Sequence, residues 1–222
     1  MNACRVVACC ALTLFLELCS NVVSAQKIFS LENEESYYST GYYYLPDSTK
    51  KSGLIKYTFR VPGSFRFKDS LTAKAITVTA DECIGFHEDG DKADFQTLSN
   101  VKLPGELVGT KVSKCFAELR ISGELCLYLV YYEKNRSRAT FVGASGFGGS
   151  IGSNPQREAT SVYVLKKKNS EVVQEVPKRA KPFKKELTAF LADKPGIVEF
   201  INSHDYTAED IEMVVQAYNY SK

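Results

Sequence analysis

The hydrophobic residues of this chain repeat with two different periods, and this change constrains the fold more than any other feature. Over most of the sequence, apolar and polar residues alternate in short runs such as 65–68 (F-R-F-K) and 75–79 (A-I-T-V-T). Such alternation is typical of strands that bury one face. From Phe183 onward, apolar residues recur four, seven and eight positions apart, as in an amphipathic helix. The sequence therefore predicts an α+β fold, with an antiparallel β-rich domain of the roll or sandwich type at 37–166 and two or three helices at 180–220.

The first 25 residues are expected to be a signal peptide that is removed from the mature protein. Arg5 supplies a positive charge, an apolar run covers 6–16, and the small residues at 23–25 (V-S-A) suit a signal peptidase. Because Glu17 ends this run, the segment falls short of the roughly 20 apolar residues that a spanning helix needs. A retained anchor and lipid modification of Cys19 are the alternatives. We expect an exported protein of the periplasm, the cell envelope or the extracellular medium, with no transmembrane segment in its mature chain.

The other segments are distinguished by composition. Residues 26–36 are expected to form a flexible leader, residues 143–155 a glycine-rich loop, and residues 167–179 a basic linker. The overall composition, with 44% hydrophobic and 24% charged residues, is that of a globular protein and argues against disorder or a fibrous repeat. A formal net charge of +2 is too small to predict attraction to nucleic acid.

A hairpin at 115–132 is the clearest β prediction. Apolar residues alternate on both sides of Ser122-Gly123, and a two-residue Ser-Gly connection suits a tight turn that needs positive φ. This turn places Ile121 opposite Glu124, which fixes the register of the two strands.

Three cysteines, Cys83, Cys115 and Cys126, follow the signal peptide. The predicted register places Cys126 opposite Leu119 rather than opposite Cys115. A disulfide between those two cysteines is therefore disfavoured, because bridged Cβ atoms lie about 3.8 Å apart. One disulfide with a free thiol and three reduced thiols both stay open.

The C-terminal part carries signals for helix starts. Pro195 suits the first turn of a short helix. Thr207 is a suitable N-cap, Asp210 completes a capping-box pattern, and Tyr206 and Ile211 occupy the two positions of a hydrophobic staple. The final helix is expected to bury Ile211, Val214, Val215 and Tyr218.

Four stretches of the sequence carry a resemblance to a known family. They are 41–43 with 53–55 (G-Y-Y and G-L-I), 79–86 (T-A-D-E-C-I-G-F), 122–128 (S-G-E-L-C-L-Y) and 183–219. Together they resemble a family of uncharacterised exported and cell-envelope proteins of Bacteroidota-type bacteria. The resemblance implies a β-rich N-terminal domain with a helical C-terminal end, and in longer relatives a continuation into an outer-membrane β-barrel. It implies no activity and no catalytic residues.

Tyrosines are concentrated in one strand-like segment, at 37–44. Because alternate residues of a strand face opposite sides, Tyr42 and Tyr44 are expected to share one face and Tyr43 the other. Exposed tyrosines offer contact area at low entropic cost, so Tyr42 and Tyr44 are candidate binding residues for a sugar or a protein. Packing within the sheet is the alternative, since tyrosine has a high strand propensity.

Basic residues dominate 166–185, where eight Lys or Arg residues accompany two Glu. Lys166, Lys167 and Lys168 are the candidate binding residues of this segment. They would suit anionic lipid headgroups, lipopolysaccharide or an acidic partner. The alternative is a solvated linker whose lysines cover the start of the first helix.

No catalytic, cofactor or metal site is predicted. The two histidines, His87 and His204, lack metal-motif spacing. The acidic residues around Gly90 do not match an EF-hand, so a solvated turn is expected there. The glycines of 146–149 lack the context of a phosphate loop, and Ser145 lacks the full G-x-S-x-G elbow.

Three functions are compatible with these features. The favoured one is a non-catalytic secreted or cell-envelope module that binds a protein, a glycan or a membrane surface. The alternative is a hydrolase with an acidic active site, for which Asp81 and Glu82 supply paired carboxylates. The third is a redox or assembly factor that uses a cysteine, which the lack of a C-x-x-C motif disfavours. Expected export argues against nucleic acid as a partner.

Overall fold

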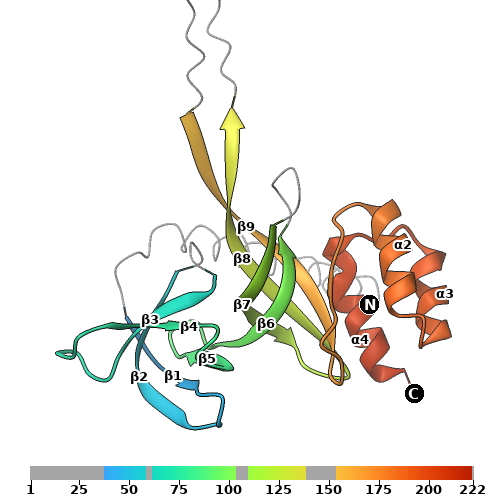
Figure 1. The fold of residues 1–222 in the computed structure, drawn as a ribbon. Helices are drawn as coiled ribbons and strands as arrows, with labels where there is room; N and C mark the ends of the chain where they lie inside the picture. The colour runs from blue at the N-terminus through green and yellow to red at the C-terminus, as the bar shows by residue number, and fades with distance from the viewer. Residues whose placement is uncertain (1–37, 59–61, 104–109, 139–153, 222) are drawn as a thin grey trace, which may run out of the picture. The chain divides into compact units, whose positions relative to one another are not determined.

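One antiparallel sheet and a group of C-terminal helices make up the described chain (Figure 1). A computed structural model describes residues 38–58, 62–103, 110–138 and 154–221. Within these ranges the sheet has ten strands, in the order β10-β9-β8-β7-β6-β5-β1-β2-β3-β4. The predicted α+β class, a β-rich domain followed by helices, is confirmed.

The bounds of the elements are as follows. The strands are β1 (Ser39–Tyr44), β2 (Lys50–Tyr57), β3 (Ser64–Lys68), β4 (Ile76–Thr79), β5 (Gly85–Glu88), β6 (Ala93–Leu103), β7 (Thr110–Ile121), β8 (Leu125–Arg138), β9 (Asn154–Lys167) and β10 (Val173–Glu175). The helices are α2 (Ala180–Phe190), α3 (Pro195–Ser203), the 3-10 turn η1 (Ala208–Asp210) and α4 (Ile211–Tyr220).

The end of the sheet that contains β1 to β5, here called the curled end, bends until it meets β7. The backbone N–H of Phe116 in β7 donates to the carbonyl of Pro62, just before β3, over 2.7 Å. The curl encloses rings that contact one another, and Phe86 and Phe95 stack with centroids 4.5 Å apart. The buried residues of this aromatic core are Tyr43, Ile55, Phe65, Phe67, Val78, Ala80, Cys83, Phe86, Ala93, Phe95 and Phe116.

The predicted helices are confirmed, and their apolar stripes share a second core with β8 and β9. Pro195 lies in the first turn of α3. Before η1, Thr207 N donates to Asp210 Oδ2 over 2.8 Å and Glu209 N donates to Thr207 Oγ1 over 3.3 Å, so the predicted capping box forms. The buried residues of this aliphatic core are Leu125, Leu127, Leu165, Val176, Phe183, Leu187, Leu191, Ile197, Ile201, Ile211, Val214, Val215 and Tyr218.

The segment predicted to be a linker, 167–179, is partly built into the sheet. It contains β10, in which Val173 lies opposite Lys166 of β9. Val176, directly after the strand, is buried in the aliphatic core. A strand of three residues is too short to show an alternating pattern in the sequence, which explains why the sequence did not predict β10.

The predicted hairpin forms between β7 and β8, but its predicted register is wrong. Leu119 lies opposite Tyr128 and Ile121 lies opposite Leu127, with a bulge between them. The strands are therefore connected by residues 122–124 rather than by a two-residue turn.

Gly123 makes room for a contact with α4, and its φ lies outside the left-handed region that favours glycine. A Cβ atom at this position would clash with the side-chain amide of Asn219. That amide accepts a hydrogen bond from Leu125 N over 2.9 Å and donates to Leu125 O over 2.9 Å. A helix side chain thus pairs with the first residue of β8 as a neighbouring strand would.

The three cysteines of the described chain are free thiols. Cys83 lies in the aromatic core. Cys115 belongs to a third buried cluster, formed by residues of β6, β7, β8 and β9, and Cys126 is half-buried. Burial raises the pKa of Cys83 to about 11 and the pKa of Cys115 to about 12. Both thiols are therefore protonated near neutral pH, which disfavours thiolate chemistry at either.

Candidate binding face

The tyrosines lie on β1, which runs between β2 and β5 in the curled end. Tyr43 is 6% exposed and belongs to the aromatic core. Tyr42 and Tyr44 are half-buried on the opposite face of the strand, so the predicted alternation is confirmed. In the sheet register, Tyr42 lies opposite His87 of β5 and Tyr44 lies opposite Lys50 of β2.

The ring of Tyr42 is held by three neighbours. The ring of His87 stacks on it with centroids 5.1 Å apart and an angle of 17° between the planes. Lys50 Nζ lies 3.5 Å from the centroid of the same ring. The ring of Tyr44 meets it edge-on, at 5.5 Å and 76°. Because His87 and Lys50 come from strands on opposite sides of β1, Tyr42 is fixed between them.

His87 is itself fixed by two carboxylates, one from Asp89 in the β5–β6 turn and one from Asp94 in β6. His87 Nδ1 lies 2.8 Å from Asp94 Oδ1, and His87 Nε2 lies 3.3 Å from Asp89 Oδ1. The side chains of Asp89 and Asp94 are 54% and 62% exposed, whereas that of His87 is 20% exposed. The acidic turn around Gly90 therefore orients an imidazole. We call Tyr42, Tyr44, Lys50, His87, Asp89 and Asp94 the tyrosine face.

Gly41 allows β1 and β5 to lie close enough for these contacts. A Cβ atom at Gly41 would clash with the carbonyl oxygen of His87, so only glycine fits there. Because Gly41 directly precedes Tyr42 in β1, this close approach places the backbone of His87 next to the strand segment that carries Tyr42.

The surroundings of Tyr42 favour its neutral hydroxyl. Burial is the main cause that raises the pKa of Tyr42, followed by the neighbouring Tyr44 and by the charges of Asp94 and Asp89. The two carboxylates that contact His87 thus also act electrostatically on Tyr42.

The basic candidates Lys166 and Lys167 are paired within the chain. Lys166 Nζ lies 3.4 Å from Glu171 Oε2, and Lys167 Nζ lies 2.6 Å from Asp193 Oδ1. Lys168 is exposed, and its backbone N–H donates to the carbonyl of Glu124 over 2.8 Å. The structure does not bring these lysines to the tyrosine face, because β8, β7, β6 and β5 separate β9 from β1 in the sheet.

The pairing of Lys167 belongs to a polar network that joins the sheet to the helices. Tyr218 Oη donates to Asp193 Oδ2 over 2.6 Å. Burial of Asp193 opposes its ionisation, but hydrogen bonds from Lys167 and Tyr218 lower its pKa overall. Lys194 Nζ lies 3.0 Å from Glu124 Oε2 and donates to the carbonyls of Tyr218 and Ser221. The charged groups of Lys167, Asp193 and Lys194 therefore make contacts within the protein that connect the sheet to the helices.

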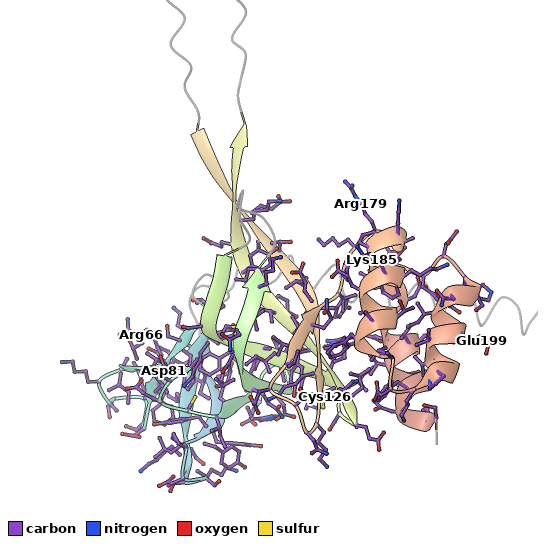
Figure 2. All side chains as sticks on the ribbon, turned by 45° about the vertical axis from the view of Figure 1, so that its right-hand side comes forward. Arg66, Asp81, Cys126, Arg179, Lys185 and Glu199 are labelled. Carbon is purple, nitrogen blue, oxygen red and sulfur yellow. The ribbon has the colours of Figure 1, made fainter. Side chains whose placement is uncertain are left out.

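The rest of the basic segment lies at the helices. Arg179 directly precedes α2 and Lys185 lies within it. Figure 2 shows both side chains at the helical end, whereas Arg66 and Asp81 lie at the curled end.

The other candidate groups have local structural partners or lie outside the described ranges. His204 Nδ1 lies 2.8 Å from Ser203 Oγ at the end of α3. Asp81 pairs with Lys114 over 2.9 Å, and Glu82 Oε2 accepts hydrogen bonds from Thr79. The signal peptide, the leader and residues 143–153 of the glycine-rich loop, including Ser145, lie outside the described residues. The last two residues of the predicted loop, Asn154 and Pro155, instead begin β9.

Sequence reasoning missed the buried charge of Glu118, which is 5% exposed. Tyr131 Oη donates to Glu118 Oε2 over 2.7 Å, and Arg120 Nη1 donates to Glu118 Oε1 over 3.0 Å. Arg120 also approaches Glu212 of α4 at 4.0 Å. The two donors compensate the buried carboxylate, and Arg120 brings this cluster close to α4. Glu118 and Arg120 lie two residues apart on one strand, so they share a face, and this spacing is the sequence feature that could have indicated their ion pair.

Among the described residues, no group of three or more His, Cys, Asp or Glu side chains is arranged to hold a metal ion. No described helix has the length and apolar character needed to cross a bilayer.

Comparison with protein-family models, with curated proteins and with solved structures gave no match to this chain.

Proposed function

We propose that this protein is an exported, non-catalytic module that binds a partner protein through its tyrosine face. The observation that carries this proposal is the fixed setting of Tyr42, whose ring is held by Tyr44, His87 and Lys50 while the side chain stays half-buried. Aromatic side chains with restricted motion lose little entropy on binding, and tyrosine is enriched at protein interfaces. Export rests on the sequence of the first 25 residues.

A protein partner is favoured over a glycan by the contacts of the Tyr42 ring. A sugar that stacks on tyrosine needs an open ring face. The ring of His87 is stacked on Tyr42, and the exposed carboxylates of Asp89 and Asp94 beside it suit a charged protein side chain better than a neutral sugar. A membrane surface is disfavoured at Lys166 and Lys167, because their charges are compensated by Glu171 and Asp193.

Affinity capture with a matched pair of variants tests this proposal. The mature chain, the double variant Tyr42→Ser/Tyr44→Ser and the control Lys168→Ala are immobilised and exposed to extract or medium from the producing cells. We expect the mature chain and the control to retain the same protein, and the double variant to lose it while its melting temperature shows that it is folded. Equal capture by all three would contradict binding through this face.

A hydrolase is the second candidate, and the pairing of His87 with Asp94 over 2.8 Å is the observation that favours it. Within the described chain, both groups that reach the His87 nitrogens are carboxylates. Release of product from ester, peptide or glycoside substrates by the mature chain, lost in His87→Ala and Asp94→Asn, would replace the binding proposal with this one.

A further inference from the structure

The ammonium group of Lys50 already occupies the tyrosine face in the manner of a cationic ligand. Lys50 Nζ lies 3.5 Å from the ring centroid of Tyr42, well within the roughly 6 Å over which a ring face attracts a cation. Tyr44 lies beside this ring, edge-on, and His87 backs it by stacking. The ring therefore presents a preorganised position for positive charge.

Lys50 differs from the other lysines that lie over rings near the helices. Lys194, over Tyr218, also contacts Glu124 and donates to two carbonyls, and Lys167, over Phe190, contacts Asp193. Lys50 is exposed, and within the described chain no carboxylate pairs with it. Its long, solvent-exposed side chain can therefore leave the ring at small cost, and an incoming cation can replace it.

Negative charge lies on the same face. Within the described residues, Asp89 and Asp94 each use one carboxylate oxygen to contact His87, and both side chains are more than half exposed. Their second oxygens are available to a donor that approaches Tyr42. A guanidinium or ammonium group can thus combine a ring contact with a charge-assisted hydrogen bond.

We propose that the tyrosine face binds a lysine or arginine side chain of the partner protein, and that Lys50 holds this position until the partner replaces it. This inference rests on the proposed function and specifies the chemistry of the partner. It also predicts that Lys50 competes with the ligand, so that its removal strengthens binding.

Peptide titration of the mature chain tests this competition. The probes are the capped tripeptides Gly-Lys-Gly and Gly-Arg-Gly, with Gly-Gln-Gly as the neutral control, and binding is followed through the NMR signals of the Tyr42 and His87 rings. We expect the cationic peptides to bind Lys50→Ala about two- to fivefold more tightly than the unchanged chain, because a cation–π contact at an exposed site is worth about that much. Tyr42→Phe should retain binding and Tyr42→Leu should lose it.

Lys51→Ala is the matched control, since Lys51 is exposed on the same strand but lies opposite Tyr43. It should bind like the unchanged chain. Equal binding by Lys50→Ala and the unchanged chain, or equal shifts with Gly-Gln-Gly, would overturn the cation proposal. If the capture experiment still shows loss of the partner in Tyr42→Ser/Tyr44→Ser, the binding module stands and only its ligand chemistry is wrong. If that loss is also missing, both proposals fail.

Discussion

The two ends of the sheet are stabilised in different ways. At the helical end, charged and amide side chains connect the sheet to the helices, as Lys167 does with Asp193 and Asn219 does with Leu125. At the curled end, rings fill the core, and the polar side chains gather outside it around Tyr42. The polar groups named at the helical end are taken up by contacts within the fold, whereas Asp89 and Asp94 at the curled end are more than half exposed. This difference supports our proposal that recognition belongs to the curled end and structural support to the helical end.

The largest expected effect tests the aromatic core. Phe65 is 2% exposed and contacts the rings of Tyr43, Phe86 and Phe116. We expect Phe65→Ala to lower the free energy of unfolding by about 3–5 kcal/mol, because it removes buried area and leaves a cavity. Urea denaturation followed by circular dichroism measures this. A loss below about 1 kcal/mol would mean that the rings do not hold this end together.

The next effect tests the polar link at the helical end. Asn219→Ala leaves the buried N–H and C=O of Leu125 without their partner, at a cost of about 1–3 kcal/mol. Gly123→Ala should also destabilise, because its new methyl group clashes with Asn219. The double variant removes both the clash and the amide, so we expect it to be more stable than the sum of the single losses predicts. Strict additivity in denaturant melts would argue against the contact.

A smaller effect is the acid sensitivity of the helical end. The pKa of Asp193 is lowered in the folded protein, so its contribution to stability is present above its unfolded pKa of about 3.8 and is lost as the pH falls through the folded value. The melting temperature of the unchanged chain should therefore drop more steeply below about pH 4 than that of Asp193→Asn. Asp205→Asn is the control, since the Asp205 side chain is 92% exposed. Identical profiles for Asp193→Asn and the unchanged chain would contradict this role.

The smallest effect is expected at Lys168, which is the exposed member of the predicted basic trio. Lys168→Ala should change the free energy of unfolding by less than about 0.5 kcal/mol, because its backbone hydrogen bond to Glu124 is kept. Lys167→Ala should cost more, since it removes the contact with Asp193. Equal losses in denaturant melts would show that the ion pair contributes nothing.

Local patterns predicted the helices well, because the stripe of α4 and the cap at Thr207 are set by residues three or four positions apart. Alternation also predicted that Tyr42 and Tyr44 share a face. The order of the strands is not encoded in such short patterns. Sequence reasoning therefore could not place His87 or Lys50 against Tyr42.

The prediction of the hairpin register was wrong for a related reason. Gly123 suggested a tight turn in the sequence. In the structure its lack of a side chain instead leaves room for Asn219 of α4, which lies 94 positions after Leu125. No window of the size used to read turns contains both partners. Only the folded arrangement shows why the glycine is there.

The pairing of Asn219 with Leu125 also has a consequence for the order of assembly. Synthesis delivers β8 before α4, so the backbone at Leu125 must wait for a partner that lies 94 positions further along the chain. Until then, the start of β8 presents a hydrogen-bonding edge that other nascent chains can reach. Synthesis of α4 and closure of this edge are thereby coupled, and a polypeptide interrupted between Leu125 and Asn219 would carry an incompletely paired strand end that favours aggregation.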